Sequence, residues 1–175
     1  MMSAIPNILS ITRIILIPIY LYFFINANYL TAGILFCISA ITDFFDGYIA
    51  RKYDAVTDLG RILDPFADKL TVISILIALL ISEIIPRIIP IILLARELFI
   101  FIGSIVAYLL GFDFIHPSKL GKFSIFLLYL AIVLQLVGIQ TFAKYLFYTV
   151  VPLNVFSGLN YVYTTIKYLS NKNNK

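Results

Sequence analysis

Six long apolar segments constrain this chain more than any other feature of its sequence. A helix needs about 20 mostly apolar residues to cross a lipid bilayer, and every one of these segments is about that long. A short polar or turn-forming stretch separates each segment from the next. The sequence therefore predicts an all-α integral membrane protein with six transmembrane helices, at residues 8–26, 29–51, 60–82, 86–110, 122–140 and 145–169.

The overall composition supports a membrane protein. The chain has 175 residues, of which 62% are hydrophobic and only 13% are charged, whereas about a quarter of the residues of a soluble domain are charged. The length suits one domain, and we expect it at residues 1–170, followed by a polar tail at 171–175. The single cysteine, Cys37, excludes an intramolecular disulfide.

The basic residues predict the orientation in the membrane. Lys and Arg residues of short loops mark the cytoplasmic side, and most of them flank the second and fourth gaps or lie in the tail. Only Arg87 and Lys144 lie near the other gaps. We therefore expect a multi-pass protein of the cell inner (cytoplasmic) membrane with both termini in the cytoplasm. This rule also explains the net charge of +4, so we expect no nucleic acid partner.

The acidic residues are concentrated in one stretch, "DFFDGYIARKYDAVTDLGRILDPFAD" at residues 43–68, which holds six of the nine acids. Its first part places five residues on one face of a helix, because they follow one another at helical spacing. They are Asp43, Asp46, Gly47, Ala50 and Arg51.

The second part of the stretch repeats this arrangement with Gly60, Asp64 and Asp68, spaced four residues apart. The first face closes the second predicted helix and the other opens the third, so the two helices are expected to be antiparallel. Four carboxylates can then converge in one small volume, at one depth on the cytoplasmic side.

Four carboxylates need a counter-charge in such a low-dielectric site. Hard oxygen ligands at this density favour two divalent cations, Mg²⁺ or Mn²⁺, and two such ions are a recurrent apparatus of phosphoryl chemistry. Close helix packing through the small residues is the simpler alternative. Packing does not, however, require aspartates between the small residues, and acids within a membrane usually mark a functional site.

Written as a pattern, residues 43–68 read D-x2-D-G-x2-A-R-x8-G-x3-D-x3-D, which resembles the signature of the CDP-alcohol phosphotransferase (CDP-alcohol phosphatidyltransferase) family without a departure. Three other stretches resemble the bacterial phosphatidylglycerophosphate synthases of that family. They are "PNILSITRIILIP" at 6–18, "ARELFI" at 95–100 and "PSKLGK" at 117–122.

The resemblance implies a six-span fold, usually a homodimer, with a polar, metal-containing cavity at the cytoplasmic side. It also implies a CDP-linked donor, two divalent metals and release of CMP. It implies that Asp43, Asp46, Asp64 and Asp68 hold the metals. Asp68 would also be the general base that takes the proton of the acceptor hydroxyl. The CDP site would be lined by Asp43, Gly47, Ala50, Arg51 and Gly60, with Arg51 near the diphosphate.

Cations on the same side of the membrane indicate which alcohol accepts the phosphatidyl group. Arg96 lies inside the fourth apolar segment, and Lys119 and Lys122 lie at the start of the fifth. Such groups beside a metal site suit an acceptor that carries a phosphate. This favours transfer from CDP-diacylglycerol to sn-glycerol 3-phosphate, which yields phosphatidylglycerol phosphate. We do not expect Arg96 to pair with Glu97, because adjacent helix residues point apart.

Other functions remain open at this point. Within the family, the acceptor could be phosphatidylglycerol, as in a cardiolipin synthase, or an inositol phosphate. In another class, a divalent-cation channel or carrier could use the aspartates as a selectivity ring. Arg51 argues against a cation pore, because it would repel the ion. Arg13, in the first apolar segment, could reach the lipid headgroups or line the cavity.

Overall fold

The computed structural model describes the backbone of residues 5–52, 58–109 and 119–173, and side chains within 10–42, 66–103, 105–106 and 120–164. The described backbone forms six helices and no strand. The helices are α1 (Ile5–Ile25), α2 (Tyr29–Lys52), α3 (Asp58–Ser82), α4 (Ile88–Leu109), α5 (Lys119–Val137) and α6 (Gln140–Asn173). The all-helical prediction is therefore confirmed. The bounds lie within a few residues of those expected, and α6 continues into the predicted polar tail.

Two helices end in the same hydrogen-bonded motif, which explains why the chain turns where it does. At the end of α5, Gly138 has a φ of 95°. Its N–H donates to the carbonyl of Gln135, and the N–H of Ile139 donates to that of Leu134 at 2.9 Å. This is a Schellman ending, in which glycine tolerates the left-handed conformation. The end of α1 has the same bonds with Ala27 at a φ of 58°.

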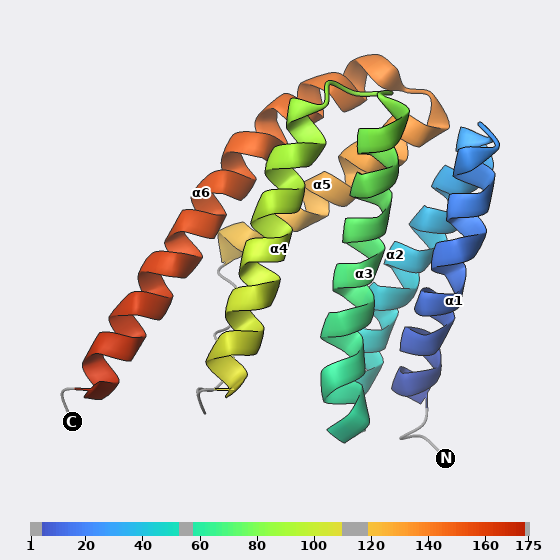
Figure 1. The fold of residues 1–175 in the computed structure, drawn as a ribbon. Coiled ribbons are helices and arrows are strands. Elements are labelled where there is room, and N and C mark those ends of the chain that lie inside the picture. Colours follow the sequence, from blue (N-terminus) through green and yellow to red (C-terminus); the bar gives the residue numbers. More distant parts are fainter. Residues whose placement is uncertain (1–4, 53–57, 110–118, 174–175) are drawn as a thin grey trace.

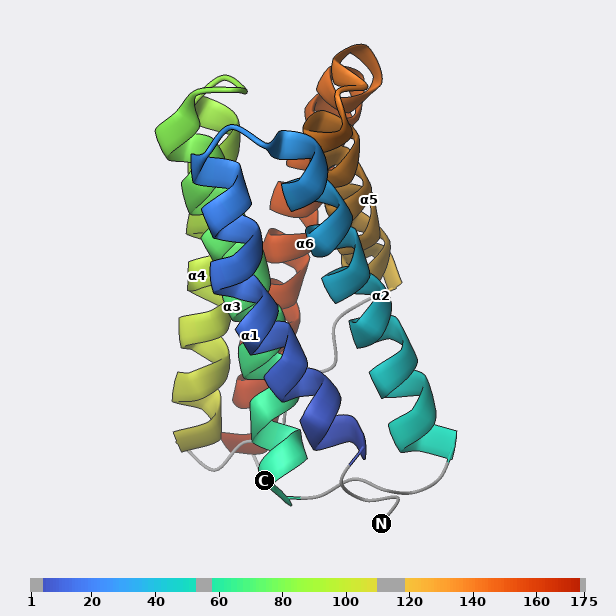
Figure 2. The same cartoon turned by 90° about the vertical axis from the view of Figure 1, so that its right-hand side faces the viewer.

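The helices are arranged so that α1 packs on both α2 and α3, α5 packs on α2 and α6, and α4 packs on α3 and α6. Figures 1 and 2 show that α2 ends and α3 begins at one end of the bundle, which we call the motif end. The first turn of α1 and the last turn of α6 lie at the same end. The first and last helices therefore bring these turns to the end that carries the aspartate stretch, and the cytoplasmic location of that end stays a prediction.

The core is apolar and continuous through the helices, and it includes Phe36, Leu76, Leu93, Leu128 and Phe147, all at most 1% exposed. Many large apolar side chains also lie on the outer surface of the described part of the chain, more than a monomeric soluble protein normally exposes. Large apolar side chains are exposed on every helix, for example Ile15, Leu30, Ile81, Phe99, Phe126 and Phe142.

One window of the described residues is long and apolar enough to cross a membrane, namely Leu120–Val137 with a mean hydropathy of 2.1. Shorter apolar helical stretches lie at Ser10–Ile25 and Tyr29–Thr42. Together with the apolar outer surface, these stretches favour contact between the bundle and lipid.

The helices α2 and α5 approach closely at Gly33. A Cβ atom added to this glycine would lie 2.9 Å from Cβ of Leu136, which is closer than two carbon atoms can approach without a shift. Absence of a side chain at Gly33 therefore sets the distance between these two helices.

Candidate functional site

The backbone places all eight motif residues on two helices. Asp43, Asp46, Gly47, Ala50 and Arg51 lie in the second half of α2, and Gly60, Asp64 and Asp68 lie in the first half of α3. Both halves are at the motif end (Figure 1). Of these eight residues, only Asp68 belongs to the part of the chain whose side chains the structure describes. The convergence of the four carboxylates therefore stays a prediction.

Asp68 is half-buried and is held by a residue from another helix. The hydroxyl of Tyr129, on α5, donates a hydrogen bond of 3.0 Å to Oδ1 of Asp68. The two residues are 61 positions apart in the chain, so helical spacing could not have paired them. Sequence reasoning missed Tyr129, because it is one of 12 tyrosines in a chain rich in aromatic residues.

The ring of Tyr129 continues into a cluster of aromatic side chains. It stacks on Phe36 of α2 with a centroid distance of 5.3 Å and an interplanar angle of 18°. Phe36 in turn meets Tyr20 of α1 edge to face, at 5.8 Å. The hydroxyl of Tyr20 donates to the carbonyl of Thr71 at 3.2 Å. This cluster therefore links α1, α2 and α5 to α3, the helix that carries Asp68.

A buried group of charges joins α3 to α4. Glu97 is 1% exposed, and Nζ of Lys69 lies 2.6 Å from its Oε2 atom. The guanidinium of Arg96 donates to the other carboxylate oxygen of Glu97. A carboxylate removed from water in this way needs a partner, and Glu97 has two.

The pairing of Arg96 with Glu97 corrects the expectation that these neighbours would not meet. Adjacent Cβ atoms do diverge on a helix, but the arginine side chain is long enough to fold back toward its neighbour. Burial favours this geometry, because only 9% of the Arg96 side chain is exposed and the protein interior makes an unpaired charge costly.

Arg96 also lies against α6. A Cβ atom added to Gly158 would be 3.3 Å from Cγ of Arg96, so this glycine leaves the space in which the arginine stem lies. The Nε atom of Arg96 is buried and has no hydrogen-bond partner among the described residues.

One turn before Gly158, Asn154 presents a second incompletely satisfied polar group. The side chain of Asn154 is fully buried. Its amide donates to the carbonyls of Ser124 and Val150 at 3.3 and 3.1 Å. Its Oδ1 atom is buried without a hydrogen-bond partner within the described part of the chain. The region between α4, α5 and α6 therefore contains a buried donor, Nε of Arg96, and a buried acceptor, Oδ1 of Asn154, that could each bond to a ligand.

Two further cations differ in their surroundings. Arg13 is 1% exposed inside the bundle, which excludes the alternative that it reaches the surrounding headgroups. Lys122 is exposed on α5, and Lys119 is the first residue of that helix, with a side chain outside the described set. Lys122 and Arg96 were predicted to bind the same phosphate. The structure shows a difference between them, because Lys122 is exposed and Arg96 is largely buried.

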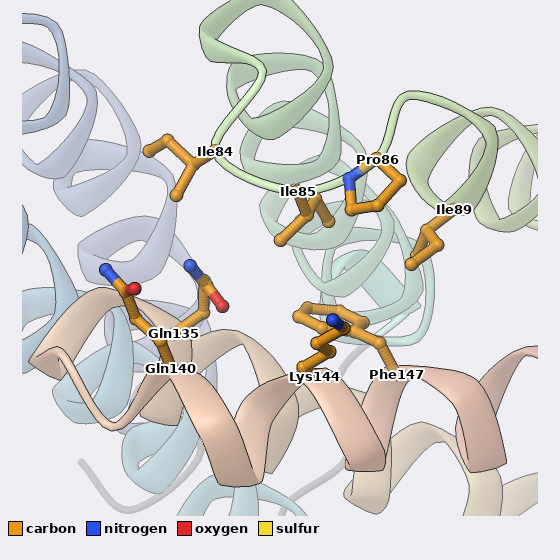
Figure 3. Close-up of a pocket in the computed structure, with 8 residues that line it drawn as sticks. All are labelled: Ile84, Ile85, Pro86, Ile89, Gln135, Gln140, Lys144 and Phe147. Carbon is orange, nitrogen blue, oxygen red and sulfur yellow. The ribbon is translucent and has the colours of Figure 1, made fainter.

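A cavity of about 140 Å³ lies at the opposite end of the bundle. Figure 3 shows the connection between α3 and α4 facing the polar ends of Gln135, Gln140 and Lys144. This cavity is not the predicted one, since α2 ends and α3 begins at the other end. Among the described side chains, no three potential metal ligands lie together, and three of the four motif aspartates are outside that set.

The sequence of this chain is similar to a protein-family model and to several bacterial proteins. Residues 3–157 match the family model described as CDP-alcohol phosphatidyltransferase. The chain is 37% identical over 140 residues to a CDP-diacylglycerol–glycerol-3-phosphate 3-phosphatidyltransferase of Rickettsia typhi, covering 78% of each chain. It is 41% identical over 138 residues to a protein of the same name from Aquifex aeolicus, covering 77% of this chain and 75% of the relative. The protein of that name from Escherichia coli K12 is 42% identical over 71 residues, 39% of each chain.

Proposed function

Because this chain belongs to the CDP-alcohol phosphatidyltransferase family, we propose that it transfers the phosphatidyl group of CDP-diacylglycerol to sn-glycerol 3-phosphate. The products are CMP and phosphatidylglycerol phosphate, so the reaction serves phospholipid biosynthesis. Relatives named for this reaction are similar over about three quarters of both chains. The observation that carries the proposal is the complete aspartate motif on two helix halves at one end of the bundle.

The four motif aspartates would hold two divalent cations, Mg²⁺ or Mn²⁺. The donor set fits these ions, since it offers only hard carboxylate oxygens. An ionised carboxylate has about four lone-pair sites, so the bond from Tyr129 to Oδ1 of Asp68 leaves sites for a cation and for the acceptor proton. When bound, the ions stabilise negative charge that develops on the phosphoryl group and on the departing phosphate.

The reaction needs one proton transfer and one displacement at phosphorus. Asp68 is the catalytic base and takes the proton of the acceptor hydroxyl. The hydroxyl oxygen then forms a bond to the phosphorus of the phosphatidyl group, and the bond from that phosphorus to the oxygen of CMP breaks. CMP leaves with the electron pair. No protein nucleophile takes part.

The donor is bound by the faces of α2 and α3 that carry the motif. Gly47, Ala50 and Gly60 leave room for the flat cytidine and for close approach of the backbone. Asp43 contributes to the same CDP site, and Arg51 lies near the diphosphate. A guanidinium suits this position because it matches two phosphate oxygens at once.

The phosphate of glycerol 3-phosphate is bound by Arg96, Lys119 and Lys122. The buried Nε atom of Arg96 supports this role, since a donor without a protein partner is available to a ligand oxygen. Lys122 is exposed on α5. An exposed ammonium group suits the first contact with the phosphate of the acceptor as the acceptor enters the site.

We further propose that all six helices span the inner membrane, with both termini and the active site facing the cytoplasm. The apolar outer surface and the bias of basic residues support this topology. Family resemblance favours a homodimer.

The test is release of CMP by the purified protein in detergent with CDP-diacylglycerol and Mg²⁺. Glycerol 3-phosphate, phosphatidylglycerol, inositol phosphate and serine are offered separately as acceptors. We expect release only with glycerol 3-phosphate. Asp68→Asn abolishes it, while Glu83→Gln, the same acid-to-amide change at an exposed position, leaves it intact.

Release of CMP with only one of the other acceptors would leave the family unchanged and would replace glycerol 3-phosphate as the proposed acceptor. No release with any of the four acceptors, in protein that still binds divalent metal, contradicts the proposed reaction and favours transport.

A further inference from the structure

Tyr129 of α5 connects the predicted catalytic base on α3 to α5 itself and, through Phe36, to α2. Its hydroxyl donates to Oδ1 of Asp68 at 3.0 Å, and both side chains are half-buried. A phenol donates a single hydrogen bond through its O–H. In the described contact this proton is directed at Oδ1, one of the two carboxylate oxygens of Asp68.

The position of the tyrosine hydroxyl is itself fixed. The ring stacks on Phe36 with centroids 5.3 Å apart, and Phe36 is fully buried. About one turn from Phe36, the close approach of α2 to α5 at Gly33 limits relative movement of the two helices. Tyr129 thus contacts both α2 and α3, the helices that carry the motif.

A carboxylate that is held at one oxygen has fewer accessible rotamers than one that is free in a polar cavity. Proton transfer requires the base within hydrogen-bond reach of the acceptor hydroxyl, and small errors of position cost rate. With Oδ1 bonded to Tyr129, Oδ2 is the oxygen that can face the acceptor.

We propose that Tyr129 is a positioning residue for the transfer reaction, holding the Asp68 carboxylate so that Oδ2 faces the acceptor hydroxyl. This inference rests on the proposed function of Asp68. Loss of a group that orients another in this way typically lowers activity about 10- to 100-fold.

The experiment compares Tyr129→Phe with Tyr20→Phe. Both changes remove one phenol oxygen and keep a ring of the same cluster. Tyr20, however, donates to the carbonyl of Thr71 and not to Asp68. We expect Tyr129→Phe to lower kcat about 10-fold or more, with the KM for glycerol 3-phosphate within about twofold. Tyr20→Phe is expected to leave kcat unchanged while lowering the thermal unfolding temperature in detergent.

A second variant, Tyr129→Leu, separates the hydroxyl from the ring. It should lose as much kcat as Tyr129→Phe, and it should be less stable because the stack on Phe36 is gone. A kcat for Tyr129→Phe within about twofold of the wild type overturns the inference, as does a loss of kcat seen only in Tyr129→Leu. Wild-type protein that is inactive with every acceptor overturns the proposed function instead, so the two failures are distinguishable.

Discussion

Nζ of Lys69 lies 2.6 Å from Oε2 of Glu97, and this ion pair ties the helix of the last motif aspartate to α4. Arg96 donates to the second oxygen of the same carboxylate. The group of two cations and one anion therefore carries a net positive charge beside the predicted acceptor site. Such a charge suits a substrate with a phosphate.

Glu97→Gln is predicted to destabilise the protein strongly. The change leaves Arg96 and Lys69, whose side chains are 9% and 16% exposed, without their shared anion, and breaking a buried pair by removing one partner costs about 3 to 5 kcal/mol. The measurement is the free energy of unfolding in mixed micelles. Glu83→Gln is the control, because it removes an exposed pair with Arg87, which contributes about 0 to 1 kcal/mol. Equal effects for the two variants would contradict the prediction.

Arg96→Lys is predicted to weaken acceptor binding more than catalysis. Lysine keeps one positive charge near Glu97 but lacks the planar fork and the Nε donor. We expect the KM for glycerol 3-phosphate to rise about 10-fold, the loss of one charge-assisted hydrogen bond, with a smaller change in the KM for CDP-diacylglycerol. Lys122→Gln, at an exposed position, should raise the same KM less. An unchanged KM in Arg96→Lys would remove this residue from the acceptor site.

Gly158→Val is predicted to weaken acceptor binding by displacing Arg96. Its Cβ atom would meet Cγ of Arg96 at 3.3 Å, and the two methyl groups add further bulk, so the arginine is displaced. The KM for glycerol 3-phosphate is expected to rise. Gly103→Val is the matched control, because a Cβ atom at Gly103 meets nothing within 4 Å. If both variants keep the wild-type KM, Arg96 does not need the space that Gly158 leaves.

Gly33→Ala is predicted to loosen the contact between α2 and α5. The new Cβ atom would lie 2.9 Å from Cβ of Leu136, and neither atom can rotate away. Overpacking of this kind costs about 1 to 3 kcal/mol of unfolding free energy. Gly103→Ala has open space and should instead stabilise its helix by up to about 1 kcal/mol. Thermal unfolding of the two variants in the same detergent tests the opposite signs.

Removal of divalent metal is predicted to stop the reaction reversibly. A chelator should abolish CMP release, and added Mg²⁺ or Mn²⁺ should restore it, because the four aspartates of the proposed metal site would repel one another and the substrate phosphates without these ions. The fold should remain, since the apolar core of the described residues packs through side chains such as Leu76, Leu93 and Phe147 that need no ion. Full activity in excess chelator would contradict a metal site at the motif.

The chain also shows how far sequence reasoning reaches. The six helices were predictable, because each apolar segment has the length of a membrane span and is followed by a break. The backbone confirms that both parts of the motif are helical, and the shared faces follow from the period of 3.6 residues and stay a prediction. The complete aspartate pattern also identified the family that the comparisons then confirmed.

The sequence by itself therefore determined the helices and the family, while the metal site at the four aspartates stays a prediction. Only the tertiary structure decided which helix faces meet. The contact of Tyr129 with Asp68 spans 61 residues, and that of Lys69 with Glu97 spans 28, so no local spacing encodes them. The pairing of Arg96 with Glu97 went against the local rule. It depends on the burial of both side chains, and burial is a property of the packed bundle and not of one helix.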